Sequence, residues 1–288
     1  LARGHVLLEG GPGLGKTRLV KVLGRLLDLD VGRVQFTPDL MPADILGGPF
    51  LEPTPAGPRV EFRPGPIFTQ LLLADEINRA NPRTQAALLE AMAEQQVTIA
   101  GETRPLPHPF FVLATNNPIE MEGTYPLPEA QADRFLMKLL VTEPSKEHLL
   151  SILELDPHDA LDSIEAIVGR DVLVTYQNHT AALPAADSVK NLVADIIMAT
   201  QPSRGAQVMG DYIQLGASPR AAQGLLAVAR ARAAMAGRLH VTADDVLASA
   251  PSVLGHRIVL GYGARADGVT AASLIERLLE PFGSSVRR

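Results

Sequence analysis

Short apolar runs alternate with stretches of helical periodicity along the first half of the chain. The runs end in glycine or polar residues, which is typical of strands buried on both faces of a parallel sheet. We expect strands at about residues 5–9, 32–37, 71–74, 110–115 and 136–141, and helices at 18–23 and 84–92. This alternation predicts an α/β domain with a parallel sheet over residues 1–142.

The second half of the chain has a mostly helical pattern. Glu143-Pro144-Ser145 interrupts the strand pattern and predicts a hinge. Helical periodicity then recurs at residues 146–154, 187–199, 221–236, 243–250 and 271–279. Ser218 and Thr242 stand where they could cap two of these helices, with Pro219 in a first turn. No heptad is sustained, which excludes a coiled coil, and we expect a smaller all-α domain over 143–288.

Two further stretches interrupt the first domain. Residues 38–66 are rich in Pro and Gly, which predicts an extended or hairpin-like insertion rather than a long helix. Residues 96–106 alternate in character and turn at a glycine, so we expect a β-hairpin. We expect Phe62 in the insertion to be packed, whereas Phe50 could be packed or presented to a partner.

A glycine-rich loop follows the first expected strand and opens a helix. Gly10, four further residues, Gly15, Lys16 and Thr17 fit the phosphate-binding P-loop pattern without a mismatch. Backbone N–H groups of such a loop and the positive end of the helix attract phosphate. Lys16 would reach the outer phosphates, and the Thr17 hydroxyl would ligate Mg²⁺. The residues expected to contact the nucleotide are Gly11, Pro12, Gly13, Leu14, Gly15, Lys16, Thr17 and Arg18. The competing interpretation, a chance glycine-rich loop before a helix, is weakened by the strand and helix patterns on either side.

Carboxylates follow the apolar run at 71–74. Asp75 and Glu76 would lie at the carboxyl end of a buried parallel strand, where open α/β sheets bind ligands. Asp75 would hold Mg²⁺, and Glu76 would orient and deprotonate the attacking water. An acidic turn after a strand is common by itself, but beside a P-loop the pair favours nucleotide hydrolysis over binding alone.

Other polar residues near expected strand ends are more ambiguous. Asn116 and Asn117 follow the run at 110–115 and could contact a γ-phosphate or the lytic water, although Asn-Asn-Pro is also a common turn sequence. Arg134 precedes the last expected strand and could simply pair with a neighbouring acid. Arg220 falls at the start of a helix, which is unfavourable for a cation, so we expect an anionic partner beside it.

Composition narrows the class of protein. The 288 residues are 46% hydrophobic, enough for a substantial core, and the net charge of −6 provides no general attraction to nucleic acid or anionic membranes. The absence of cysteine excludes disulfides and thiolate metal sites. We find no membrane span and no signal-peptide pattern, and expect a cytoplasmic protein. Because the chain begins at Leu1 with a strand close behind, we also expect an upstream segment to be missing.

Several motifs together resemble the MoxR family of AAA+ ATPases. They are the P-loop, Ala-Asp-Glu-Ile-Asn-Arg-Ala at 74–80, Thr-Gln-Ala-Ala-Leu-Leu-Glu-Ala-Met at 84–92, Ala-Thr-Asn-Asn-Pro at 114–118, Gly-Thr-Tyr-Pro-Leu-Pro-Glu-Ala-Gln at 123–131 and Gly-Ala-Ser-Pro-Arg-Ala at 216–221. The resemblance implies an αβα AAA+ core followed by a helical lid domain. It also makes 38–66 the family's helix-2 insert and the hairpin near 96–106 its pre-sensor insert.

The same resemblance implies roles for single residues. Asn117 would sense the γ-phosphate, although the family usually has Gln where Asn116 stands. Arg134 would be the arginine finger of the neighbouring subunit's site, and Arg220 would be the second sensor. For His256 we favour a structural role over a catalytic one.

The resemblance further implies a Mg²⁺-dependent ATPase that works as a homo-oligomeric ring, a hexamer in our interpretation. Its role would be to remodel and activate a partner protein, in this family often one with a von Willebrand factor A (VWA) domain. Two alternatives stay open, a nucleic-acid motor and a slow nucleotide-gated scaffold. The net acidic charge and the single Arg104 of the hairpin, offset by Glu102, disfavour the motor.

Overall fold

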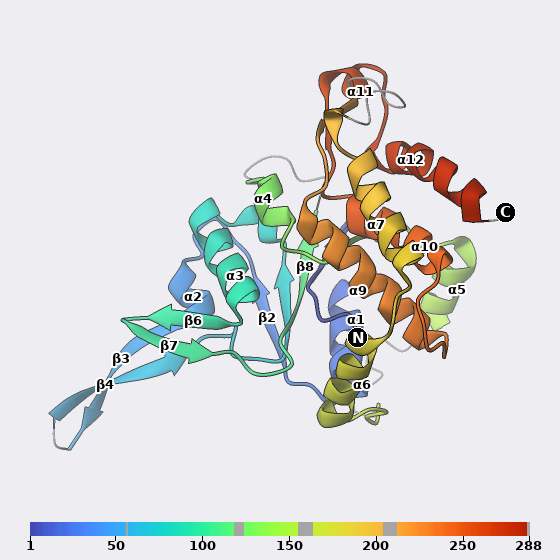
Figure 1. Ribbon diagram of the computed structural model, residues 1–288. Coiled ribbons are helices and arrows are strands. Elements are labelled where there is room, and N and C mark those ends of the chain that lie inside the picture. The colour runs from blue at the N-terminus through green and yellow to red at the C-terminus, as the bar shows by residue number, and fades with distance from the viewer. Residues whose placement is uncertain (56, 118–123, 155–163, 204–211, 287–288) are drawn as a thin grey trace. The chain divides into compact units, whose positions relative to one another are not determined.

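The computed structural model describes residues 1–55, 57–117, 124–154, 164–203 and 212–286 (Figure 1). The chain forms two compact units. The first, here called the sheet unit, comprises His5–Leu127 and Leu139–Leu173. The second, the helical unit, comprises Leu1–Gly4, Pro128–Lys138 and Val174–Arg288. Residues 128–138 therefore belong with the helices, although they precede the boundary predicted after residue 142.

A five-stranded sheet organises the first half of the chain. Its strands are β1 (Val6–Glu9), β2 (Val31–Gln35), β5 (Leu71–Asp75), β8 (Phe111–Asn116) and β9 (Met137–Leu140). The order is β2-β5-β8-β1-β9, and the pairs β2–β5, β5–β8 and β1–β8 are parallel. Leu71, Leu72, Leu73 and Ala74 of β5 are at most 1% exposed. The continuous apolar runs therefore mark strands covered on both faces, as the sequence predicts.

The described part of the sheet unit also contains four helices. They are α1 (Lys16–Leu26), α2 (Pro42–Leu46), α3 (Pro82–Glu94) and α5 (Lys146–Glu154), with a 3₁₀ turn, η1, at Ile77–Arg79. Asn81 caps α3 by accepting a hydrogen bond from the Thr84 N–H, and Pro82 occupies the first turn. The buried face of α3 carries Leu88, Ala91 and Met92, so the predicted helix is confirmed.

The two expected irregular stretches form hairpins. β3 (Gly47–Thr54) pairs with β4 (Gly57–Pro64), and β6 (Gln96–Ile99) pairs with β7 (Glu102–Pro105). The hairpins lie side by side (Figure 1), since the Arg104 guanidinium stacks 4.1 Å from the centroid of the Phe62 ring. Phe62 also meets the edge of Phe68, which confirms that it is packed. Phe50 is 52% exposed and is thus presented at the surface.

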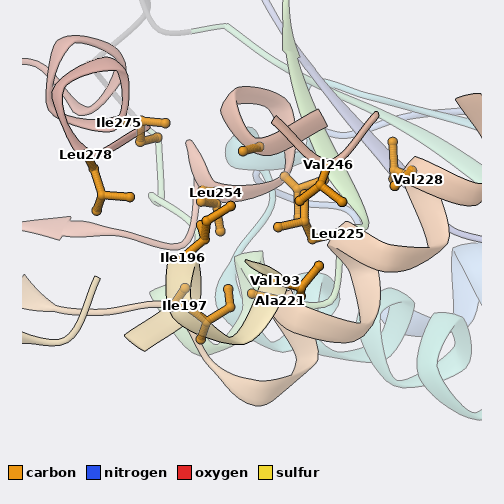
Figure 2. Packing of buried hydrophobic residues seen from close by; sticks show 14 of the residues in the cluster. Val193, Ile196, Ile197, Ala221, Leu225, Val228, Val246, Leu254, Ile275 and Leu278 are labelled. Carbon is orange, nitrogen blue, oxygen red and sulfur yellow. The ribbon is translucent and has the colours of Figure 1, made fainter. Parts of the chain in front are cut away.

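The described residues of the helical unit form helices and one short strand pair. Its elements are α4 (Glu129–Ala132), α7 (Asp187–Ala199), α9 (Pro219–Met235), α10 (Ala243–Leu254), α11 (Tyr262–Ala266), α12 (Ala271–Val286), most of α6 (Arg170–Ala182), and the strands β10 (Ile213–Leu215) and β11 (Val259–Leu260). Figure 2 shows apolar side chains of α7, α9, α10 and α12 packed together, among them Ile196, Leu225 and Leu254, which are fully buried. The sequence predicted α7, α9, α10 and α12 but missed α4, α6, α11 and the β10–β11 pair. None of the helices in the described parts of the chain is long and apolar enough to cross a membrane.

The two predicted helix caps have different outcomes. Thr242 forms a capping box with Asp245 at the start of α10, as predicted. Arg238 donates two hydrogen bonds to the Asp245 carboxylate, at 2.6 and 2.5 Å, and lowers the pKa of Asp245 to about 2. Ser218 precedes α9, with Pro219 in the first turn, but its side chain does not cap the helix. The prediction of a Ser218 cap is wrong because the hydroxyl donates to Asp133 instead.

His5 is a buried polar residue beside β1. Its Nδ1 accepts a hydrogen bond from the Val112 N–H at 3.0 Å, and its Nε2 lies 3.1 Å from the Met92 carbonyl oxygen. These partners select the neutral ring with its proton on Nε2. Burial lowers the pKa of His5 to about 4. The ring is therefore held neutral inside the sheet unit.

We predict an acid-sensitive stability that depends on His5. The folded-state pKa of about 4 lies below the ordinary value of 6.5, so the unfolded chain binds more protons between these values and stability falls as the pH falls through that window. The loss should be on the order of 2–3 kcal/mol. Thermal unfolding followed from pH 7.5 to 4.5 should show a shallower decline for His5→Gln than for the unchanged protein.

His240→Gln provides the control, because His240 is exposed. Its melting temperature should follow that of the unchanged protein across the same pH range. Equal pH dependence of the His5→Gln variant and the unchanged protein would show that His5 does not carry the effect.

Candidate functional site

The loop between β1 and α1 has an open backbone cradle. Gly13 and Gly15 adopt φ angles of 78° and 74°, in the left-handed region that glycine enters at little cost. Apart from each glycine and its two chain neighbours, no atom of the described residues lies within 4 Å of where a Cβ on either glycine would stand. The Lys16 ammonium donates to the Gly10 carbonyl oxygen at 2.8 Å, and α1 begins at Lys16. The loop thus presents free space beside a helix N-terminus and a lysine.

Asp75 lies at the carboxyl end of β5, in the same unit. Its Oδ1 accepts a hydrogen bond from the Thr115 hydroxyl, and its Oδ2 accepts one from the Arg33 guanidinium, both at 2.7 Å. The Asp75 side chain is 14% exposed. The carboxylate is therefore oriented by neighbours on both β8 and β2.

Glu76 follows with a backbone conformation that is rare for a side-chain-bearing residue. Its φ is 58°, in the left-handed region, which costs on the order of 1–2 kcal/mol. The Glu76 N–H donates to the Thr115 hydroxyl at 2.8 Å, so Thr115 contacts both acidic residues. Glu76 Oε2 accepts from Gln35 at 2.9 Å and from Arg79 at 3.1 Å. The Gln35 and Arg79 bonds thus hold the Glu76 carboxylate in one orientation.

The remaining candidates of the sheet unit lie around these groups. The Asn116 carbonyl accepts from the Gly10 N–H at 3.2 Å, which ties β8 to the glycine-rich loop. Asn117 is only 3% exposed, and its carbonyl oxygen accepts from Asn78 at 3.4 Å. Thr17 is half-buried in the first turn of α1, and Arg18 is exposed there. Pro118 and Gly123, the ends of two motifs, lie outside the described residues.

Arg134 and Arg220 belong to the helical unit rather than to the sheet unit. Arg220 lies in the first turn of α9, and its Nη1 is 3.4 Å from Asp133 Oδ2. Asp133 is thus the anionic partner expected near this helix start. Arg134 follows Asp133 directly and is half-buried.

His256 contacts the same segment. Its Nε2 lies 3.0 Å from the Phe135 carbonyl oxygen. Burial, aided by the nearby Arg257 charge, lowers the pKa of His256 to about 4. A neutral ring bonded to backbone agrees with the structural role favoured for His256.

Sequence reasoning missed three contributors to these arrangements. Thr115 stands one residue before the Asn pair, and Gln35 ends the strand next to β5, so both could have been found by aligning the carboxyl ends of adjacent strands. Arg257 is 5% exposed and donates to Asp133. No spacing in the sequence connects residues 124 positions apart, so only the structure identifies this pair.

The geometry of the sheet unit fits a nucleoside triphosphate. The cradle has room for phosphate oxygens, backbone N–H groups and Lys16 supply positive potential, and oriented carboxylates stand at the ends of neighbouring strands. A glycine-rich loop that follows one strand of a parallel sheet, with acidic residues at the end of a nearby strand, defines the class of P-loop nucleotide-binding proteins.

Comparison with known proteins identifies the family. Residues 5–137 match the ATPase family associated with various cellular activities (AAA), and residues 205–278 match the AAA lid domain. Chaperone MoxR1 of Mycobacterium tuberculosis is 42% identical over 97% of this chain and 74% of that protein. The protein YeaC of Bacillus subtilis is 40% identical over 100% of this chain and 88% of its own length. A crystal structure from Cytophaga hutchinsonii superimposes with a TM-score of 0.90 at 41% identity, covering 97% of this chain and 85% of the other.

The chain belongs to the MoxR family of AAA+ ATPases. Membership confirms the predicted fold, an AAA+ core with a parallel sheet followed by a helical lid domain. It also confirms that the protein binds nucleotide and hydrolyses ATP. The individual site residues stay predictions.

We predict that Thr115→Val impairs turnover beyond its effect on stability. Valine keeps the shape of threonine but leaves Asp75 without one donor and the Glu76 N–H without its acceptor, so Glu76 loses its fixed orientation. Unfolding free energy should fall by about 1–3 kcal/mol. The kcat of ATP hydrolysis should fall on the order of 10-fold, measured at saturating ATP well below the melting temperature.

Thr84→Val is the matched control. Thr84 is fully buried in the same unit and donates to the Leu40 carbonyl oxygen at 2.7 Å. It should lose similar stability with kcat nearly unchanged. Equal kcat losses in the two variants would mean that Thr115 acts through stability alone.

Proposed function

We propose that this chain is a Mg²⁺-dependent remodelling ATPase that acts as a ring of identical subunits, with each site shared between neighbours. The observation that carries the hydrolytic part is the link through Thr115. A single hydroxyl orients Asp75 and the Glu76 turn together, at the same sheet edge as the glycine-rich loop. Such an arrangement serves phosphoryl transfer, which depends mainly on positioning and charge stabilisation.

The sheet unit would supply the hydrolytic groups. Thr17 and Asp75 would hold Mg²⁺, which supplies charge neutralisation at the phosphates. Lys16 would give up its bond to the Gly10 carbonyl and reach the outer phosphates, and the other nucleotide contacts would come from residues 11–18. Glu76 would orient the attacking water and accept its proton.

Three further residues would sense the nucleotide or complete a site. Asn117 would read the γ-phosphate, and its burial, together with the bond from the Asn78 side chain to its backbone carbonyl, supports a fixed backbone position. Arg220 would be the second sensor. Arg134 would complete the site of the neighbouring subunit as an arginine finger.

We propose that the ring is a hexamer. The family supports an oligomer, because AAA ATPases are generally oligomeric.

The work done by hydrolysis would be remodelling of a partner protein. The name of the relative Chaperone MoxR1 supports this direction. We propose a partner with a VWA domain, on the strength of the family resemblance. ATP turnover measured with and without a purified VWA-domain candidate tests this choice, and an unchanged rate with no complex formed would reject that candidate class.

The described hairpins provide little support for a nucleic-acid motor. Arg104 pairs with Glu102 and stacks on Phe62, so its charge is already engaged. On the neighbouring hairpin, Arg59 lies 3.9 Å from Glu61. We therefore expect no nucleic-acid partner. A scaffold that hydrolyses slowly would instead show turnover that a partner does not change.

We predict that Glu76→Gln binds ATP but does not hydrolyse it. Glutamine keeps the size and can still accept a hydrogen bond, but it cannot take a proton from water. Nucleotide affinity from fluorescence titration should change less than about threefold, while phosphate release falls by at least about 100-fold. Rapid turnover in the variant would remove Glu76 as the base.

We predict that Arg134→Ala abolishes turnover with nucleotide binding retained. An arginine finger contributes on the order of 10³–10⁵ in rate, and the residue would act on the neighbour's site. The exposed Arg232→Ala on α9 is the control and should leave kcat unchanged. Turnover of Arg134→Ala at the unchanged rate with saturating ATP would refute a shared site.

A further inference from the structure

A buried arginine holds the segment that carries Arg134. The side chain of Arg257, just after α10, is only 2% exposed. Its guanidinium donates hydrogen bonds to Asp133 Oδ1 at 2.8 Å and to the carbonyl oxygens of Asp133, Phe135, Leu136 and Val253 at 3.2, 2.6, 2.9 and 2.6 Å. All these groups belong to the helical unit.

The acceptors of Arg257 flank Arg134 on both sides. The Asp133 carbonyl and carboxylate precede it, and the Phe135 and Leu136 carbonyls follow it. A guanidinium is a rigid planar fork with five N–H donors, so it fixes the relative positions of groups that it contacts together. Arg257 therefore fixes the backbone before and after Arg134, while the Arg134 side chain takes no part in these bonds.

Stability alone is a weak reason for a charge in this place. Burial lowers the pKa of Arg257, with Asp133 opposing that shift. A buried ion pair often contributes no more than well-packed apolar side chains would. By contrast, Arg238 and Asp245 form a pair at the other end of α10 whose arginine is 35% exposed and serves a helix cap. Arg257 and the Arg238–Asp245 pair therefore lie near opposite ends of α10, and the second pair, which stabilises a helix start, is a natural control for the first.

We propose that Arg257 is a positioning residue for ATP hydrolysis, which fixes the 133–136 backbone so that Arg134 reaches the neighbouring subunit's site. This inference rests on the shared site proposed above. Arg257 itself does not touch nucleotide; it acts through Arg134.

Asp133 also bonds to residues at the start of α9. The Ser218 hydroxyl lies 3.1 and 2.9 Å from its two carboxylate oxygens, and Arg220 lies 3.4 Å away. Arg220 is 56% exposed, so this contact is weak compared with the buried bonds of Arg257. Loss of Arg257 should accordingly affect Arg134 first and Arg220 little.

The test uses Arg257→Lys in the full chain. Lysine keeps the charge but has a single donor centre, so it cannot bridge acceptors on both sides of Arg134. We expect kcat to fall on the order of 10–100-fold with nucleotide affinity changed less than about threefold. The control Arg238→Lys should reduce the melting temperature comparably and leave kcat within about twofold.

Mixed rings separate a role in the neighbour's site from damage to the subunit's own site. Glu76→Gln subunits have a dead site but an intact Arg134, whereas Arg257→Lys subunits should have an intact site and a misplaced Arg134. Random mixing at equal amounts should restore about a quarter of the unchanged protein's turnover per subunit, because about a quarter of the interfaces pair two intact halves. The Arg134→Ala and Glu76→Gln mixture is the reference and should recover equally.

Each outcome decides the inference. Recovery in the reference mixture without recovery for Arg257→Lys overturns the positioning role and leaves the proposed function standing. No recovery in the reference mixture overturns the shared site and the inference with it. If Arg257→Lys fails to fold, Asp133→Asn replaces it in the mixture, because this change weakens the same Arg257–Asp133 contact. The same criteria then apply.

Discussion

The parallel alignment of β5, β8 and β1 is the constraint on which the nucleotide site depends. Parallel neighbours end at the same edge of a sheet, so residues far apart in the sequence meet there. Asp75 is the last residue of β5, Thr115 and Asn116 end β8, and Gly10 follows β1. The Gly10–Asn116 backbone bond and the Thr115–Asp75 bond connect the three strand ends directly. Positioning of the reacting groups is thus a property of the sheet rather than of any one loop.

Strain at this edge is concentrated at Glu76. The residue adopts a positive φ, and the Thr115 hydroxyl satisfies its backbone N–H. Gln35 and Arg79 then hold the carboxylate. Strained backbone persists where neighbouring groups over-determine it, which is typical of residues whose direction matters chemically. The cost of the turn is offset by a network that spans β2, β5 and β8.

Charge in the helical unit is organised around two aspartates. Asp245 accepts from Arg238 and from the Thr242 backbone, which stabilises the start of α10. Asp133 accepts from Arg257, Ser218 and Arg220 and so connects the 133–136 segment to α9 and to the short segment after α10. Both carboxylates are little exposed, at 5% and 17%, which strengthens their hydrogen bonds relative to surface pairs.

The sequence by itself determined the five strands of the main sheet, most helices and the nucleotide-binding loop, because each depends on local periodicity or on a contiguous motif. Continuous apolar runs marked β5 and β8, and the glycine spacing with Lys16 marked the loop. Only the tertiary structure shows which groups Thr115, Gln35 and Arg257 bond to. It also shows that the Ser218 hydroxyl donates to Asp133 and does not cap α9. A hydroxyl or guanidinium takes whichever acceptor the packed elements bring within about 3 Å. That choice depends on contacts between segments far apart in the chain, which no local pattern records.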